Sequence, residues 1–282
     1  METSEKLKQL VREKYSEIAL QNKENNMASC CGSGGCSTEV YNIMSDDYTT
    51  QQGYNPDADL GLGCGIPTEY ADMKEGDTVV DLGSGAGNDC FVARSFVGES
   101  GKVIGIDMTE AMIDKARENA EKLHFNNVEF RLGEIEKMPL TANKADVIVS
   151  NCVLNLVPDK NKAFQEIFRV LKPGGHFSIS DVVLVGDLPK NLREASEMYA
   201  GCVSGAIQKN EYLAIIQATG FTNIKIQKEK VITLPDDILH AYLSEEELKL
   251  YRASKVGIFS ITVYASKPTE SACCPPGCCD PK

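Results

Sequence analysis

Short apolar runs and amphipathic segments alternate through the middle of the chain. Five apolar runs predict strands, at 78–80, 103–106, 127–132, 145–149 and 176–183. Between the last two runs, apolar residues at helical spacing predict a helix that ends at the Lys172-Pro173-Gly174-Gly175 segment. Its apolar positions are Ala163, Ile167, Phe168, Val170 and Leu171. Strands that alternate with helices predict an α/β fold, with a Rossmann-like sheet and helices on both of its faces.

The segments on both sides of this core carry other patterns. Residues 1–28 predict an N-terminal helix, and its apolar stripe either packs on the sheet or covers a ligand site with Tyr15. Beyond the core we expect helices at 192–206 and 211–219 and strands at 223–233 and 258–265. The chain is therefore divided into an N-terminal helix with cysteine-containing loops (1–69), a core (70–183), a C-terminal α+β substrate-binding extension (184–267) and a disordered tail (268–282).

A glycine-rich turn follows the first predicted strand of the core. It runs from Asp81 to Gly87 with the sequence Asp-Leu-Gly-Ser-Gly-Ala-Gly, and Asp107 ends the next strand twenty positions after Gly87. A strand, a glycine turn, a helix and a second strand ending in a carboxylate are typical of a unit that binds an adenosine cofactor. A carboxylate directly before the glycines repels a diphosphate and attracts an ammonium. The pattern therefore favours S-adenosylmethionine, which has an α-amino group, a sulfonium and no phosphate, over NAD or FAD.

The expected contacts with this cofactor follow the loops after the strands. Asp107 is expected to accept hydrogen bonds from the two ribose hydroxyls, and Glu134 to bind the adenine amino group. Glycines at the turn let the backbone approach the ligand closely. The predicted cofactor-binding residues are Asp81, Gly83, Gly85, Gly87, Asp107, Met108, Glu134, Ile135 and Asn151.

Charge and hydropathy narrow the class of partner. The chain has 282 residues and a formal net charge of −12, which argues against nucleic acid because a phosphate backbone requires a basic surface. The sequence contains no run of eighteen apolar residues, and its first residues resemble no signal peptide. We therefore expect a cytoplasmic protein with a small-molecule substrate and no membrane partner, with a monomer as the default state.

Eleven cysteines are the other unusual feature, and in a reducing compartment they are more often ligands or nucleophiles than disulfides. Cys152 follows the fourth predicted strand, where an open α/β sheet places its reacting groups. Cys64 lies in a glycine-flanked loop before the core, and Cys202 lies among small residues beyond the fifth strand. Each of the three is either a ligand or a buried thiol packed as a small hydrophobe. Cys90 is expected to be such a packing residue.

Two resemblances follow from these motifs. The order of strands and helices over 79–183, the glycine turn and the Leu-Lys-Pro-Gly-Gly segment at 171–175 resemble class I S-adenosylmethionine-dependent methyltransferases. Over about 11–263 the chain looks like the arsenite methyltransferases. This closer resemblance rests on the segments 81–90, 63–65, 150–156 and 199–202. It implies that Cys64, Cys152 and Cys202 bind As(III) and that Cys36 can pair with Cys64. The chain departs from some members of the family at Leu62, where they have an aromatic residue.

Methylation of As(III) requires thiolate ligands and a source of electrons. Soft thiolates select a thiophilic acceptor, and arsenic(III) held by three sulfurs keeps a lone pair that attacks a sulfonium methyl without a general base. Transfer oxidises the arsenic, so we hypothesise that formation of a Cys36–Cys64 disulfide supplies two electrons. An external thiol system, glutathione or thioredoxin, then restores the thiols.

Alternatives to this interpretation remain open. The chain could instead be a methyltransferase for an organic acceptor such as a quinone or a sterol, with the three cysteines as packing residues, or an arsenic or metal buffer without activity. The tail cysteines, Cys273, Cys274, Cys278 and Cys279, could capture As(III), bind zinc or copper, or have no effect on turnover. Of these, an accessory tail is the first expectation.

Overall fold

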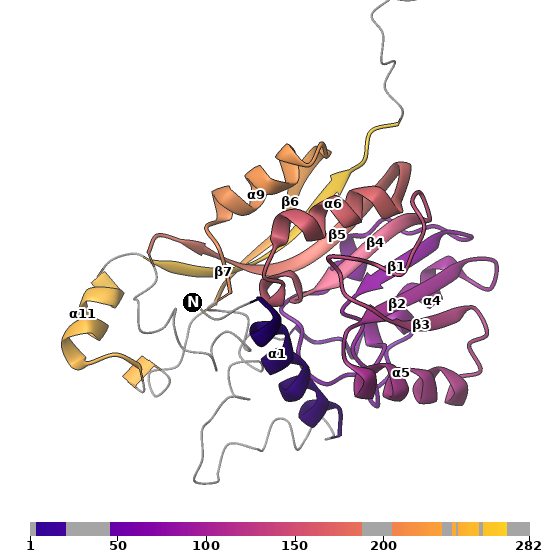
Figure 1. Cartoon of the computed structure of the whole chain (residues 1–282), viewed down its shortest axis with the longest axis horizontal. Helices are drawn as coiled ribbons and strands as arrows, with labels where there is room; N and C mark the ends of the chain where they lie inside the picture. Colours follow the sequence, from indigo (N-terminus) through magenta and orange to yellow (C-terminus); the bar gives the residue numbers. More distant parts are fainter. Residues whose placement is uncertain are drawn as a thin grey trace, which may run out of the picture.

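Seven strands form one sheet in the order β3-β2-β1-β4-β5-β7-β6 (Figure 1). The structure is a computed structural model that describes residues 4–20, 46–187, 205–232, 239–240, 242–253 and 256–269. The strands are β1 (Thr78–Leu82), β2 (Lys102–Asp107), β3 (Val128–Leu132), β4 (Ala145–Asn151), β5 (Leu171–Val185), β6 (Thr222–Ile232) and β7 (Gly257–Ser266). The helices are α1 (Ser4–Ala19), α4 (Asn88–Val97), α5 (Glu110–Lys122), α6 (Lys160–Val170), α9 (Lys209–Ala218) and α11 (Glu245–Ala253). Two short 3₁₀ helices are η1 (Pro67–Tyr70) and η2 (Leu154–Leu156).

The side chains of the parallel strands alternate between two buried faces. Val80 and Leu82 of β1 pack with Phe164 of α6 and Tyr212 of α9 on one face. Val79 packs with residues of α4 and α5 on the other face. Because helices cover both faces, the four residues 79–82 of β1 are all buried, and burial along the strand is continuous rather than alternating. The Rossmann-like fold expected from the sequence is therefore confirmed.

The end of α6 and the start of β5 differ from the expectation. The helix ends at Val170, and β5 already begins at Leu171, so the Lys172-Pro173-Gly174-Gly175 segment lies inside the strand. The pairing of β4 with β5 shifts register between Ala145 and Val147, opposite this segment. A bulge of this kind accommodates a proline and glycines that a regular strand excludes.

The strands expected in a C-terminal extension complete the central sheet. β7 is antiparallel to both β5 and β6, so it lies between them at the end of the sheet. The helix expected at 211–219 corresponds to α9. Most of the helix expected at 192–206 lies outside the described residues, as does the tail at 270–282.

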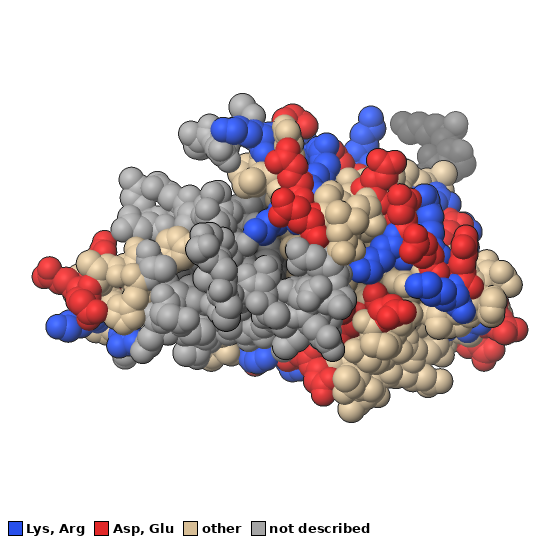
Figure 2. Space-filling model, turned by 90° about the horizontal axis from the view of Figure 1, so that it is seen from below, with Lys and Arg blue, Asp and Glu red and all other residues tan. Residues whose placement is uncertain are grey.

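The N-terminal helix α1 packs beside α5, where the Lys115 ammonium donates to the carbonyl of Ala19 at 2.9 Å. Two apolar residues of this helix, Val11 and Ile18, are buried. No helix within the described residues is both long and apolar enough to span a membrane. On the face shown in Figure 2, acidic and basic side chains are interspersed over the described surface.

Candidate active site

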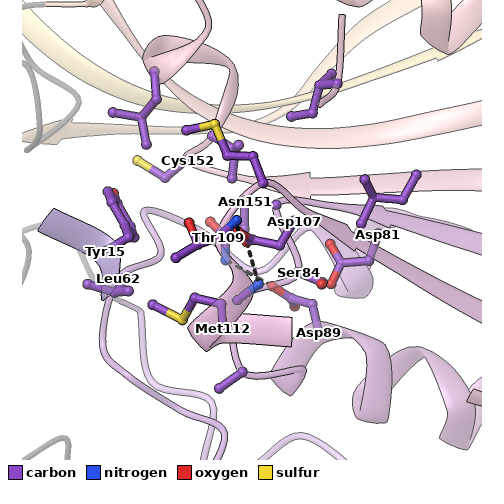
Figure 3. A pocket seen from close by; sticks show the side chains of 18 of the residues that line it. Tyr15, Leu62, Asp81, Ser84, Asp89, Asp107, Thr109, Met112, Asn151 and Cys152 are labelled. Atoms are coloured by element: carbon purple, nitrogen blue, oxygen red, sulfur yellow. Dashed lines mark hydrogen bonds between the residues drawn. The ribbon is translucent and has the colours of Figure 1, made fainter. Parts of the chain in front are cut away.

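A pocket opens at the carboxyl ends of β1, β2, β3 and β4, and α1 supplies one of its walls (Figure 3). Because the strands are parallel, the loops that follow them meet at one edge of the sheet, where open α/β folds bind their ligands. Most of the predicted cofactor residues line this pocket: Asp81, Gly83, Gly85, Asp107, Met108, Glu134, Ile135 and Asn151. Gly87 is not among the lining residues.

The glycine turn closes tightly because it lacks side chains. Gly83 has a φ of +68°, and a Cβ there would lie 2.4 Å from Cγ2 of Val153. Only glycine meets both conditions without strain. Gly87 caps the start of α4, and a Cβ there would lie 2.9 Å from the rings of Phe91 and Phe130. The structure thus places Gly83 against the pocket and Gly87 in the packing between α4 and the sheet.

Asp81 is a buried carboxylate at the end of β1. The thiol of Cys90, on α4, donates to its Oδ2 at 3.3 Å. Burial and the nearby charges of Asp89 and Asp107 raise the pKa of Asp81 well above its ordinary value. Cys90 is fully buried, as expected of a packing residue, and burial and Asp81 raise the pKa of its thiol.

Asp89, in the first turn of α4, is a pocket carboxylate that is absent from the site residues predicted from the sequence. Its Oδ1 accepts a hydrogen bond from the Tyr48 hydroxyl at 2.7 Å, and its Oδ2 accepts one from the Asn151 amide at 3.3 Å. Burial raises its pKa to about 6 in spite of these two donors. A feature of the sequence could have predicted it: Asp89 is a carboxylate two residues after the glycine turn, at the N-terminus of a helix that faces the pocket.

Asp107 ends β2 and faces the glycine turn. The backbone N–H of Gly85 donates to its Oδ2 at 3.0 Å, and that of Thr109 donates to its Oδ1 at 2.8 Å. These bonds orient the carboxylate toward the pocket, and burial raises its pKa. The arrangement leaves acceptor sites on both oxygens for ligand hydroxyls.

Glu134, expected at the adenine, is joined to the N-terminal helix. The Lys8 ammonium lies 2.7 Å from its Oε2 and also pairs with Glu136, and both bonds raise the pKa of Lys8. Lys8 is 126 residues away along the chain, so local sequence patterns do not indicate this pair. The ion pair fixes α1 against the loop after β3.

The charge of the lining residues favours a cation. Six carboxylates line the pocket, and Lys8 is the single basic residue among the described side chains that line it. The six are Asp59, Asp81, Asp89, Asp107, Glu134 and Glu136. Ser84 adds a buried Oγ without a hydrogen-bond partner in the described part of the chain. A ligand with an ammonium, a sulfonium and further polar groups fits these residues, whereas a pyrophosphate does not.

Cys64 lies at the same edge of the sheet in a loop that has no room for side chains at the neighbouring positions. A Cβ on Gly63 would lie 2.5 Å from the Asn151 amide nitrogen, and one on Gly65 would lie 2.6 Å from Ser180 Oγ. The N–H of Cys64 donates to Asn151 Oδ1 at 3.0 Å, and the Ser260 hydroxyl donates to the Cys64 carbonyl. Cys64 itself is fully buried.

Cys152 follows β4 and lines the pocket (Figure 3). Its φ of +61° is uncommon for a residue with a side chain, and its N–H donates to the Ser180 carbonyl at 2.7 Å. Cys64 and Cys152 belong to one buried cluster, which also contains Ala206. The other two predicted cysteines, Cys202 and Cys36, lie outside the described residues.

Tyr15 of α1 lies beside Leu62 at the wall of the pocket (Figure 3). It packs against the cluster of Cys64 and Cys152 and also against the cluster around α4 and α5. An aromatic ring therefore borders both the cofactor pocket and the cluster that contains the two cysteines. It comes from the N-terminal helix and not from the loop position of Leu62.

The comparisons with known proteins agree with this geometry. Residues 73–220 match the model of a methyltransferase domain. An arsenite methyltransferase of Halobacterium salinarum is 38% identical over 94% of this chain and 68% of its own length. One from Aquipseudomonas alcaligenes is 32% identical over 83% of this chain and 68% of its own length.

A solved structure gives the same result. The crystal structure of an arsenic(III) S-adenosylmethionine methyltransferase from Chlamydomonas reinhardtii superposes with a TM-score of 0.63 at 29% identity. The match covers 85% of this chain and 76% of that one. With its Rossmann-like sheet, its acidic cofactor pocket and these relatives, the chain belongs to the arsenite methyltransferase family of class I methyltransferases.

Proposed function

We propose that this chain transfers methyl groups to trivalent arsenic held by the thiolates of Cys64, Cys152 and Cys202, with S-adenosylmethionine as the donor. The observation that carries the proposal is the position of Cys152. Its side chain belongs both to the wall of the acidic pocket and to the buried cluster that contains Cys64. Ala206, four residues after Cys202, lies in the same cluster, which supports Cys202 as the third ligand.

Different pocket residues would contact different parts of the cofactor. Asp89 and Asp81 would hold the α-ammonium, since they are buried carboxylates at the same end of the pocket. Asp107 would accept the ribose hydroxyls. Met108 and Ile135 would border the adenine. Because Glu134 is already paired with Lys8, its contact with an adenine amino group would use the second carboxylate oxygen.

The reaction requires that the methyl acceptor be held in position, and it requires no general acid or base. S-adenosylmethionine supplies a methyl group on a sulfonium, which leaves as a neutral thioether. Thiolates raise the electron density on arsenic, and its lone pair forms the new As–C bond while the C–S bond breaks toward sulfur. The arsenic is thereby oxidised from +3 to +5, and two electrons must return it to the trivalent state.

We also propose that thiols supply those electrons. Oxidation of Cys36 and Cys64 to a disulfide would release two electrons, and an external dithiol or glutathione would reduce the pair again. This chemistry needs a compartment that keeps thiols reduced, as the cytoplasm does. Mapping of disulfides by mass spectrometry after a single turnover tests the step, and it is excluded if Cys36 stays alkylatable.

Arsenic speciation tests the main proposal. The chain is incubated with As(III), S-adenosylmethionine and a thiol reductant, and the products are separated by liquid chromatography with elemental mass detection. Methylated arsenicals are expected from the wild type and from Cys279→Ser, a matched change in the tail. They should be absent with Cys152→Ser and Cys202→Ser, while S-adenosylhomocysteine still binds. Methylation that survives both changes would remove the thiolates from the mechanism.

A further inference from the structure

Asn151, the last residue of β4, holds both sides of Cys64. Its Oδ1 accepts the N–H of Cys64 at 3.0 Å, and its Nδ2 donates to the carbonyl of Gly65 at 2.8 Å. These two bonds connect one side-chain amide to two consecutive residues of the loop. The next residue after Asn151 is Cys152, so the same turn carries one thiol and fixes the backbone of the other.

The hydrogen-bonding capacity of this amide is used within the protein. Besides Gly65, the Nδ2 donates to the Tyr48 hydroxyl at 2.7 Å, with Asp89 Oδ2 at a longer 3.3 Å. An amide nitrogen has two N–H bonds, and these three acceptors within the protein share them. Asn151 therefore has its donors directed at the Cys64 loop and at Tyr48, not at a ligand in the open pocket.

We propose that Asn151 is a positioning residue that seats the Cys64 thiol beside Cys152 for arsenic, rather than a residue that binds the cofactor. The inference rests on the proposed function, because it assigns Asn151 to the arsenic side of the site. It differs from the role expected from the sequence, which placed Asn151 among the residues that bind S-adenosylmethionine.

The loop needs such a partner because glycines flank the cysteine. Gly63 and Gly65 have no side chains to anchor the loop, and glycine loses more conformational freedom on ordering than any other residue. The Ser260 hydroxyl fixes the Cys64 carbonyl from β7, and Asn151 fixes the N–H before it. The other thiol is held independently, since the Cys152 N–H donates to the Ser180 carbonyl at 2.7 Å. Loss of the Asn151 amide should therefore free Cys64 and leave Cys152 in place.

Two binding measurements on Asn151→Ala distinguish a residue that positions Cys64 from one that binds the cofactor. As(III) binding is measured by equilibrium dialysis with elemental mass detection, and S-adenosylhomocysteine binding by calorimetry. We expect As(III) affinity to fall by about tenfold, the loss that one or two buried hydrogen bonds produce, and S-adenosylhomocysteine affinity to change by less than about twofold. Asn155→Ala is the matched control: it removes another buried amide four residues along the chain, which donates to the Val182 carbonyl at 2.7 Å. Both affinities should stay within about twofold of wild type.

Thiol reactivity provides a readout that a general loss of stability does not reproduce. Alkylation by iodoacetamide is followed by mass mapping of single cysteines. In Asn151→Ala, Cys64 should react several-fold faster than in the wild type, with Cys152 unchanged. If Asn151→Ala does not fold, Tyr48→Phe removes one hydroxyl from the same network and should give a smaller effect in the same direction.

Different results would overturn the positioning role of Asn151 and the proposed function. Loss of S-adenosylhomocysteine affinity as large as that of As(III), or unchanged affinity for both, would overturn the positioning role. Failure of the wild type itself to bind As(III) would overturn the proposed function instead. If Cys64 and Cys152 become reactive together, the effect is a general opening of the site, and the specific assignment to Cys64 is wrong.

Discussion

Replacement of Asp89 by Asn removes one charge from the cofactor pocket and keeps the shape of the side chain. Burial raises the pKa of Asp89 from 3.8 to about 6. The folded protein therefore binds more protons than the unfolded chain between these two values, and its stability falls as the pH rises through that window. Well above pH 6 the cost of the ionised carboxylate is fully present, on the order of 3 kcal/mol, and at pH 5.0 it is roughly half as large.

The Asn side chain escapes this cost but loses a hydrogen bond. Asp89 accepts from both Tyr48 and Asn151, whereas an amide oxygen replaces only one of the two carboxylate oxygens. The lost bond costs about 1–1.5 kcal/mol. Without ligand, Asp89→Asn should thus be more stable than the wild type by roughly 2 kcal/mol at pH 7.5, a rise in Tm of about 5 °C. At pH 5.0 the two proteins should be nearly equal.

Ligand binding should change in the opposite direction. Calorimetry with S-adenosylhomocysteine should show wild-type affinity about tenfold weaker at pH 5.0 than at 7.5, because the ionised fraction of Asp89 falls about tenfold. The variant should bind on the order of tenfold more weakly at pH 7.5, with a smaller dependence on pH. Asp81 is present in both proteins, so the comparison at each pH reports on Asp89. Equal Tm values at pH 7.5, or equal affinities, would refute a buried anionic Asp89 at the ammonium site.

Two further changes test the walls of the pocket. Gly83→Ala places a Cβ 2.4 Å from Val153 Cγ2 at a φ of +68°, so it should lower the free energy of unfolding in urea by about 2 kcal/mol. Addition of Val153→Ala should recover part of this loss, and no recovery would mean that the clash is not the cause. Lys8→Met breaks the ion pair with Glu134 and Glu136 and should cost about 1–2 kcal/mol. Hydrogen exchange should then show faster opening of α1. Unchanged protection of α1 would mean that this ion pair does not stabilise the helix.

Several features of the molecule follow from local sequence. The glycine turn, the carboxylates that end β1 and β2, and the apolar strands are each indicated within about thirty residues of chain, because backbone sterics and hydrophobic periodicity act over such lengths. The position of Cys152 directly after a buried strand likewise predicts its place at the carboxyl edge of the sheet. These features were sufficient to predict the fold and the methyl donor.

Local patterns were less informative where a segment depends on its neighbours in the sheet. The Pro-Gly-Gly segment at 173–175 has the composition of a helix stop, yet it lies inside β5. Leu171 and His176, on either side of it, pair with β4, and its two glycines exchange backbone hydrogen bonds with Lys267 just beyond β7. The strands β6 and β7 show strand composition in the sequence. Only their hydrogen bonds show that they complete the central sheet.

The sequence by itself predicted most of the groups of the proposed site: acids and glycines for a cationic adenosine cofactor, and cysteines for the proposed arsenic substrate. The tertiary structure decided how they are held. Asn151 bonds to Tyr48 across 103 residues, and Lys8 bonds to Glu134 across 126. Such pairs leave no periodic signal, since a hydrogen bond depends on distance and direction between side chains that only the packed sheet and α1 bring together.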